Sequence, residues 1–382
     1  MATTLVIEPH DPVLVRDGRP FGVEGQDART LPWPLPQTVA GAVRTWLGDA
    51  LAWDWHGDGP DRALRVEVHG PLLLDREQPL FPCPRDALPP PGDGNQPIRP
   101  LRLAPEAAGA AAAGTLWPVG VPLRAPVPPA DQRPDAKAGL PEYWGRVAFE
   151  NWLAGHQVEL DDRNSLAKLA REARVHVAVD LTTGTSREGA LFVTESLALG
   201  PDQRMMCRLA VPGDPADVLP GRGVLTLGGQ RRVSFVHRAQ SETEAWPGCP
   251  SPELCRALTG TRRLRLVLVT PALFTGGWLP GWLDPSTLHG TLPASAELGA
   301  TLVSAVVGNY LPVSGWSYDR RSPGPRPQRR AAPAGSVYFL ELDRDLTPDD
   351  IAALWMQPVS DTPQDCRDGY GLVALGTWTE RH

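Results

Sequence analysis

The distribution of proline limits the fold of this 382-residue chain more than any other feature of its sequence. Fifteen of the 43 prolines fall between Pro82 and Pro141. Because proline lacks an N–H donor and restrains the residue before it, a stretch so rich in proline favours an insertion over a domain. Its length also exceeds that of an ordinary connection within a compact fold. We therefore expect either a binding arm or a partly disordered loop here.

The composition is that of a folded protein with many loops. The 38 glycines and 43 prolines make up a share below the roughly 25–30% that is typical of low-complexity disorder. At roughly 100–200 residues per domain, the length suggests two domains. The first twelve residues lack a basic leader, and glycine or proline interrupts the longest uncharged stretches, 107–123 and 298–318. We therefore expect a soluble, cytoplasmic protein without a membrane span.

Charge is distributed unevenly along the chain. The net charge of −7 lowers the expectation of nucleic-acid binding unless a local basic patch supplies it. Between Arg222 and Arg265 there are eight arginines and three glutamates, whereas from Glu341 to His382 there are nine acidic residues and three arginines. One face can thus be basic, and the acidic C-terminal region becomes a candidate protein interface.

Apolar patterning predicts helices mixed with strands. Val39, Val43, Trp46 and Leu47 follow the spacing of a core-facing helical stripe. Further strands are expected at residues 4–8, 65–74, 175–181, 191–199, 233–236, 264–270, 301–307, 336–342 and 372–378. Further helices are expected at 142–153 and at 347–356, the latter capped by Thr347. The arginine-containing segment 320–330, rich in proline and glycine, is expected to be an exposed loop.

Each half of the chain ends in a glycine-rich turn that leads into a final strand. One turn contains Gly228 and Gly229, and the other contains Gly369 and Gly371. The βαββαβ-like order predicts an α+β fold with two ferredoxin-like (RRM-like) domains. We expect these domains at residues 1–240 and 241–382, with the long Pro-rich insertion at about 82–141 in the first.

The first glycine turn suggests a phosphate-binding site. Glycine allows backbone N–H groups to approach phosphate oxygens, and the guanidinium groups of Arg231 and Arg232 could pair with them. A tight turn at a domain edge with solvated arginines fits the same pattern. Aromatic residues near the basic segments could stack on unpaired bases or pack in the core, namely Phe21, Trp33, Trp316 and Tyr318.

Enzyme motifs are absent from the sequence. There is no Walker A sequence, no G-x-S-x-G and no H-E-x-x-H. The five cysteines are scattered, and Cys249 with Cys255 lacks a second ligand pair, so we expect no metal and no disulfide framework. His10 and His237 could act as acid or base in RNA cleavage, although no spacing rule pairs them.

Seven collinear segments together resemble a known family. They are RDGRPF at 16–21, PQTVAGAVR at 36–44, the 175–199 hairpin with its TGT and EGAL, LGGQRR at 227–232, VSGW at 313–316, PAGSV at 333–337 and YGLVALGTW at 370–378. These segments resemble the RAMP-superfamily subunit of the type III-B (Cmr) CRISPR effector complex, the subunit that holds the 5′ end of the CRISPR RNA. The resemblance covers nearly the whole chain.

The resemblance implies a non-catalytic subunit, without metal or cofactor, that grips the 5′ tag of the crRNA in an antiviral ribonucleoprotein. It implies docking onto the large polymerase-like subunit and onto the adjacent backbone RAMP subunit. Carried over to this sequence, the expected RNA contacts are Arg16, Arg19, Gln37, Thr38, Gly41, Arg44, Gly228, Gly229, Arg231 and Arg232. The second glycine turn is acidic, with Asp365 and Asp368, so a structural or protein-facing role is expected there.

Two alternatives stay open from the sequence. The chain could be a metal-independent endoribonuclease that processes precursor crRNA, with His10 or His237 as acid or base. It could also be a purely structural scaffold whose arginines meet acidic protein surfaces.

Overall fold

The computed structural model describes residues 2–16, 29–89, 97–107, 123–127, 139–213, 219–241, 244–295, 297–317 and 323–380. The chain forms two compact units. Unit 1 consists of Met1–Glu77, Leu169–Ala245 and Pro312–Arg329, and unit 2 consists of Gln78–Lys168, Trp246–Leu311 and Arg330–His382. The chain leaves unit 1 and enters unit 2 between Ala245 and Trp246, close to the boundary expected after residue 240. The assignment of domains to 1–240 and 241–382 stays a prediction.

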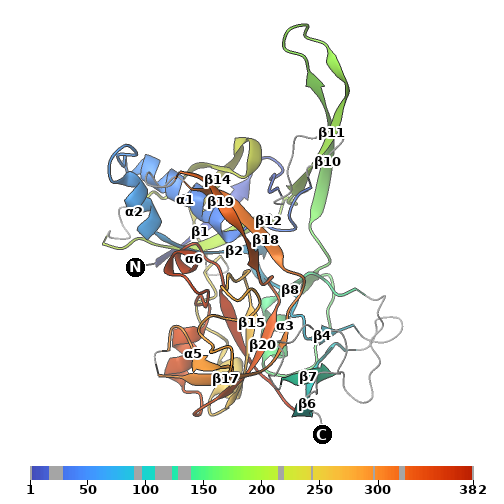
Figure 1. Cartoon of the computed structure of the whole chain (residues 1–382), viewed down its shortest axis with the longest axis vertical. Helices are drawn as coiled ribbons and strands as arrows, with labels where there is room; N and C mark the ends of the chain where they lie inside the picture. Colours follow the sequence, from blue (N-terminus) through green and yellow to red (C-terminus); the bar gives the residue numbers. More distant parts are fainter. Residues whose placement is uncertain are drawn as a thin grey trace. The chain divides into compact units, whose positions relative to one another are not determined.

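Unit 1 is built on an antiparallel sheet (Figure 1). The strands are β1 (Ala2–Pro9), β2 (Glu67–Asp75), β12 (Gln203–Ala210), β13 (Arg222–Leu227) and β14 (Arg232–Arg238). Their order is β13-β14-β1-β12-β2, so the first strand of the chain lies in the centre. Strand β1 pairs with β12 on one side and with β14 on the other. Strand β13 therefore forms an edge and contacts the sheet through β14.

Helix α1 (Pro36–Ala50) covers one face of this sheet, against β2 and β13. Proline occupies the first helical position, where its missing N–H costs no hydrogen bond. The predicted stripe of Val39, Val43, Trp46 and Leu47 is buried. Trp46 packs closely on Gly223 at the start of β13, where a Cβ would collide with the indole nitrogen. A shorter helix, α2, follows at Gly59–Arg65.

Two hairpins extend unit 1. Strands β10 (Ala170–Val179) and β11 (Ser186–Ala198) form the predicted hairpin, which projects away from the rest of the unit (Figure 1). Strands β18 (Leu311–Ser317) and β19 (Gly324–Ala331) form the second. The expectation of a loop over 320–330 is therefore wrong for its later part. Proline is tolerated in β19 because the pair forms a separate two-stranded sheet with outer edges.

Unit 2 contains a second antiparallel sheet, in the order β16-β17-β20-β15-β21. Its strands are β15 (Arg263–Leu268), β16 (His289–Thr291), β17 (Gly299–Val306), β20 (Val337–Leu342) and β21 (Val373–Thr377). Helices α3 (Arg146–Leu153), α4 (Pro252–Leu258) and α5 (Pro348–Leu354) pack against β21. The predicted strands 264–270, 301–307, 336–342 and 372–378 are confirmed, and each of their ends lies within two residues of the predicted position.

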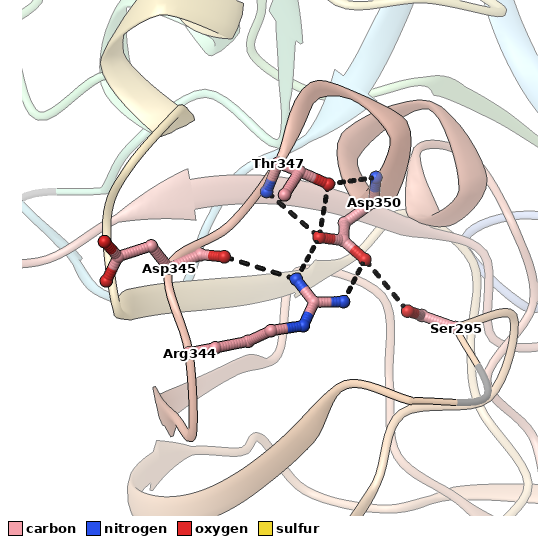
Figure 2. A network of polar contacts seen from close by, with 5 residues as sticks. All are labelled: Ser295, Arg344, Asp345, Thr347 and Asp350. Atoms are coloured by element: carbon pink, nitrogen blue, oxygen red, sulfur yellow. Dashed lines mark hydrogen bonds and ion pairs between the residues drawn. The ribbon is translucent and has the colours of Figure 1, made fainter.

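Helix α5 begins with the capping arrangement expected from its sequence. Thr347 accepts a hydrogen bond from the backbone N of Asp350, and the Asp350 carboxylate accepts one from the backbone N of Thr347. Figure 2 shows that Arg344 and Ser295 also donate to this carboxylate. The buried Asp350 thus holds the helix start, the preceding loop and the segment before β17 together. A short helix, α6 (Pro363–Arg367), follows later in the chain.

The Pro-rich insertion contains short paired strands where it is described. Strands β3 (Gln78–Pro82), β8 (Tyr143–Gly145) and β9 (Ser165–Leu166) pair in that order around it. Within it, β4 (Ala87–Leu88) pairs with β5 (Arg99–Pro100), and β6 (Arg102–Ala107) pairs with β7 (Arg124–Val127). Residues 90–96, 108–122 and 128–138 of the insertion lie outside the described residues.

A buried ion pair fixes the insertion to strand β15 within unit 2. Arg265 on β15 is 1% exposed and pairs with the fully buried Asp86, and its Nη2 donates to the carbonyl oxygen of Trp152 at 2.6 Å. The Trp152 indole donates to Asp86 at 3.1 Å. The overall result is a mixed α/β fold of several antiparallel sheets with few helices. The two ferredoxin-like domains stay a prediction.

Candidate nucleic-acid interface

The glycine turn joins β13 to β14 at the edge of the unit 1 sheet. Gly228 has φ 73° and ψ −159°, a conformation that is essentially restricted to glycine. Gln230 and Arg231 follow with φ 59° and 51°. A Cβ on Gly228 would lie 2.5 Å from the carbonyl oxygen of Leu14. Glycine is required here because the chain's own backbone approaches the turn.

The first loop is fastened to this turn. The backbone N of Gly229 donates to the carbonyl oxygen of Leu14 at 2.7 Å, so this N–H is already used within the protein. Arg16 and Thr30 form an isolated antiparallel bridge that closes the base of the loop. The exposed Arg16 thus lies two residues from the contact with the turn. Arg19, a further predicted contact, lies outside the described residues.

The start of helix α1 presents three predicted contacts on one side. Thr38 and Gln37 precede Gly41 by three and four residues, so the three share a helical face. The Gln37 side-chain amide donates to the carbonyl oxygen of Ser314 in β18. Gly41 is exposed, and a Cβ added there would meet nothing within 4 Å. This face therefore offers an open backbone surface beside a side chain that already binds β18.

Arg44 points into the protein instead. It is 7% exposed, and its guanidinium donates to the carbonyl oxygen of Val66 through Nε at 3.1 Å and Nη2 at 2.6 Å. A buried carbonyl just before β2 needs a donor, and Arg44 supplies it. This geometry gives Arg44 a role in fixing α1 to the sheet, and its contact with RNA stays a prediction.

The two arginines of the turn differ in their surroundings. Arg231 is exposed at the end of the turn. Arg232 is half-buried, and its Nη2 donates to the Gln230 side chain at 2.8 Å. In β14 it lies on the same face as the buried Ser234 and Val236. Arg231 is therefore the arginine of this turn that offers its guanidinium to an external anion.

The predicted stacking residues separate into two kinds. Trp33 is half-buried, and its indole donates to the carbonyl oxygen of Pro71 at 3.1 Å, as a packed tryptophan does. Trp316 is 57% exposed and follows Gly315, which sits against the Gln37 side chain. An exposed indole thus lies close to the start of α1. Phe21 and Tyr318 lie outside the described residues.

An exposed aromatic ring that was not predicted from the sequence lies on the same hairpin as the glycine turn. Phe235 in β14 is 45% exposed, and its direct partner Val224 in β13 is 56% exposed. The signal was present in the alternation of β14, where Ser234 and Val236 take the buried positions and leave Val233 and Phe235 on the open face.

The two histidines of the nuclease alternative are not paired with each other. The His10 ring meets the Phe235 ring edge to face at 5.8 Å between centroids, and the backbone N of His10 donates to Val233. His237 lies four residues after Val233, about 13 Å along the strand, and faces Glu244 at 3.9 Å. Each ring thus has a different neighbour, and the nuclease alternative, which needs only one of the two histidines, stays a prediction.

The second glycine turn is built into the core of unit 2. Asp365, Asp368 and Tyr370 are all buried. Gly371 has φ 81°, and a Cβ added there would lie 2.6 Å from the Ser360 hydroxyl oxygen. The Asp365 carboxylate accepts from the hydroxyl of Thr362 at 2.6 Å, at the start of α6. These contacts favour the structural role that its acidic residues indicated.

The described ranges contain neither a cluster of metal ligands nor a helix that could span a membrane. Across residues 2–380 with the gaps given above, no three side chains of His, Cys, Asp or Glu gather in a way that could hold a metal ion. In the same ranges, no helix combines the length and the apolar character that are needed to cross a membrane. The expectation that the protein uses no metal or cofactor stays a prediction.

Several solved structures contain chains that are similar to this one. A chain of the type III-B Cmr-beta complex bound to cognate target RNA and AMPPnP matches with a TM-score of 0.46 and 16% identity, over 88% of this chain and 86% of that chain. A chain of the Csm3–Csm4 subcomplex of the type III-A CRISPR-Cas interference complex matches with a TM-score of 0.39 and 10% identity, over 90% and 94%. No curated protein matches this chain.

The family comparison covers far more than any single motif. Residues 5–378 match the family described as CRISPR-associated protein (Cas_Cmr3), a span that runs from β1 through the final strand β21 and includes the glycine turn and the start of α1. Because nearly the entire chain takes part in this match, it decides the assignment where the structural similarities, with TM-scores below 0.5, do not. The chain belongs to the Cas_Cmr3 family of CRISPR-associated proteins.

Proposed function

We propose that this chain binds the 5′ tag of the crRNA and helps to assemble the effector complex, without catalysing a reaction itself. Membership of the Cas_Cmr3 family makes it a component of a type III-B Cmr CRISPR effector complex. The observation that carries the tag-binding role is the β13–β14 turn, whose backbone is fixed to Leu14 while Arg231 stays exposed. Because the backbone of this turn is already fixed, binding through Arg231 does not carry the entropic cost of ordering the loop.

The neighbouring features support the same role. Arg16 lies next to the turn through its loop, and α1 carries Gln37, Thr38 and Gly41 on one face. In unit 1, helix α1 connects β1 to β2, and the sheet places β14, β1, β12 and β2 in that order. This arrangement agrees with a ferredoxin-like module. An interface of this kind needs only a local basic surface, since other subunits of the particle can contribute further positive charge.

We assign protein partners by charge and family. The proposed partners are the large polymerase-like subunit and the adjacent backbone RAMP subunit. In the acidic C-terminal region, Asp345 and Asp349 are exposed and could meet a basic partner surface.

A salt-titrated binding experiment tests the proposal. The full chain together with its large partner subunit is mixed with two guide RNAs, one with the intact 5′ tag and one with the tag scrambled. We expect tag-dependent binding of uncut RNA. In the variant Arg231→Ala with Arg232→Ala, we expect weaker binding and a log-log salt slope that is smaller by about 0.7 for each lost phosphate contact.

The matched control removes two exposed arginines from unit 2, as Arg256→Ala with Arg262→Ala. It changes the net charge by the same amount, so the salt slope should change only if general charge decides binding. An unchanged slope in the Arg231 and Arg232 variant would contradict the assignment of the turn. Metal-independent cleavage that a single histidine substitution abolishes would favour the nuclease, and equal weak binding of both RNAs would favour the scaffold.

A further inference from the structure

The open face of the β13–β14 hairpin carries an apolar patch that folding does not require. In a strand with one buried face, the outward residues are usually polar. Here Val224, Val233 and Phe235 point outward, with exposed fractions of 56%, 36% and 45%. The inward positions of β14 include Ser234, which is fully buried. Within the described part of the chain, these larger apolar residues thus lie exposed on the outer face.

The patch is built around a pair of rings. Phe235 lies directly opposite Val224 on β13 and opposite Glu8 on β1, so these three side chains share one face. The His10 imidazole adds an edge-to-face contact with the Phe235 ring at an interplanar angle of 74°. The phenyl ring is therefore flanked by a second aromatic ring, in a strand that is paired on both sides.

Positive charge lies at both ends of this patch. Arg222 is the direct partner of His237 on the same face, two residues beyond the pair of Val224 and Phe235. Arg231 lies in the turn at the opposite end, four residues before Phe235. An extended single strand that crosses the patch could thus place a phosphate near each arginine and a base in between. Glu8 would repel a phosphate but can accept a hydrogen bond from a base amino group.

We propose that Phe235, framed by His10, is a stacking site for one unpaired RNA base, and that Glu8 favours a base with an exocyclic amino group. This inference rests on the proposed RNA-binding function and adds a second contact area to it, on the face of the sheet opposite to Arg232. Aromatic side chains on an open sheet are a common platform for single-stranded RNA, and stacking does not depend on base identity. The aliphatic neighbours Val224 and Val233 would then cover the ribose of the stacked nucleotide.

The test uses the full chain with its large partner subunit and a set of tagged guide RNAs, each with 2-aminopurine at one tag position. Stacking on Phe235 should quench the fluorescence at one position. Phe235→Leu keeps an apolar side chain but removes the ring, so we expect the quench to vanish and the affinity to fall roughly five- to 150-fold. Phe235→Tyr keeps the ring and should bind as the unaltered chain does. The salt slope should stay the same in both variants, because stacking releases no counterions.

The controls separate this inference from the proposed function. Tyr310→Leu makes the same ring-to-leucine change at an exposed residue of unit 2 and should leave binding unchanged. If the unaltered chain fails to bind the tag, the proposed function is wrong. If it binds with the expected salt slope while Phe235→Leu binds equally well and stays quenched, only the stacking site is wrong. Loss of complex assembly in Phe235→Asp, with full RNA affinity in Phe235→Leu, would overturn the inference in favour of a protein interface.

Discussion

The carbonyl oxygen of Leu14 accepts a hydrogen bond from the backbone N of Gly229 at 2.7 Å, and this contact joins the first loop to the turn between β13 and β14. The two residues lie more than two hundred positions apart in the sequence. Their contact fixes both the exposed Arg16 and the exposed Arg231 relative to the same piece of backbone. The glycines of the turn therefore act on the protein's own geometry, by positioning these two arginines.

Gly228→Ala should destabilise unit 1 and weaken RNA binding together. A Cβ at this position would lie 2.5 Å from the Leu14 carbonyl oxygen, and the backbone conformation is one that alanine rarely adopts. We expect a loss of about 1–3 kcal/mol in the free energy of unfolding, from the strain alone. Denaturant titration measures this loss. An unchanged midpoint with an unchanged slope would show that the turn relaxes without cost.

Gly41→Ala is the matched comparison, since it adds the same methyl group to a glycine with open surroundings. A Cβ there meets nothing within 4 Å, and alanine is favoured over glycine inside a helix by up to about 1 kcal/mol. We expect equal or higher stability. If RNA approaches the backbone of α1 closely, tag binding should nevertheless weaken. Unchanged affinity in a stable Gly41→Ala variant would remove Gly41 from the interface.

Sequence patterns predicted the elements whose side chains have one clear buried face. The stripe around Val43 and the cap at Thr347 both depend on residues close together in the chain, so helices α1 and α5 could be located well. The interleaving of the two units could not be predicted, because it depends on pairings between distant segments. The short strands of the Pro-rich insertion were not predicted either, because each pair contains only a few residues.

Only part of the candidate site could be predicted, because the sequence shows residue types but not the partners of each side chain. The composition near residue 230 indicated an arginine-bearing glycine turn, and the turn exists. Residue type alone could not show that Arg44 would bind the Val66 carbonyl or that Arg232 would share a face with Ser234. In an apolar strand, the pattern also leaves open which alternating set faces the helix. For this reason the exposure of Phe235 was not predicted.

The ion pair between Asp86 and Arg265 should contribute strongly to the folding of unit 2. Both side chains are almost completely buried, so removing one leaves the other charge without its partner in a poorly solvated site. We expect Asp86→Ala to lower the free energy of unfolding by about 3–5 kcal/mol. Asp345→Ala removes the partner of Arg262 in an exposed pair and should cost less than about 1 kcal/mol. Similar losses in the two variants, measured by urea titration, would contradict this distinction.

Asp350 should make unit 2 sensitive to acid. The hydrogen bonds from Arg344, together with those from Thr347 and Ser295, hold the pKa of the Asp350 carboxyl well below its usual range (Figure 2). A carboxyl whose pKa is lower in the folded state stabilises the protein above the unfolded pKa, near pH 4. This stabilisation is lost as the pH falls toward the folded pKa.

The variant Asp350→Asn should therefore lose about 1–3 kcal/mol at neutral pH, and the difference from the unaltered chain should shrink below about pH 4. Asp349→Asn is the control, because Asp349 lies in the same first turn but is exposed. Thermal unfolding from pH 2 to pH 7 measures both. A constant difference across that range would show that the charge of Asp350 is not what stabilises the helix start.

His69 should give unit 1 a second dependence on pH, at a higher range. Burial in β2, and secondarily the charge of Arg208 on the neighbouring strand, lowers the pKa of His69 to about 4. The unfolded chain takes up the proton near pH 6.5, whereas the folded chain resists it down to about pH 4. Stability should therefore fall as the pH drops through this window, by up to about 3 kcal/mol. In His69→Gln this part of the pH dependence should disappear, while the corresponding change at the exposed His156 should leave it intact. A slope between pH 6.5 and pH 4 that survives in His69→Gln would place its source in another group.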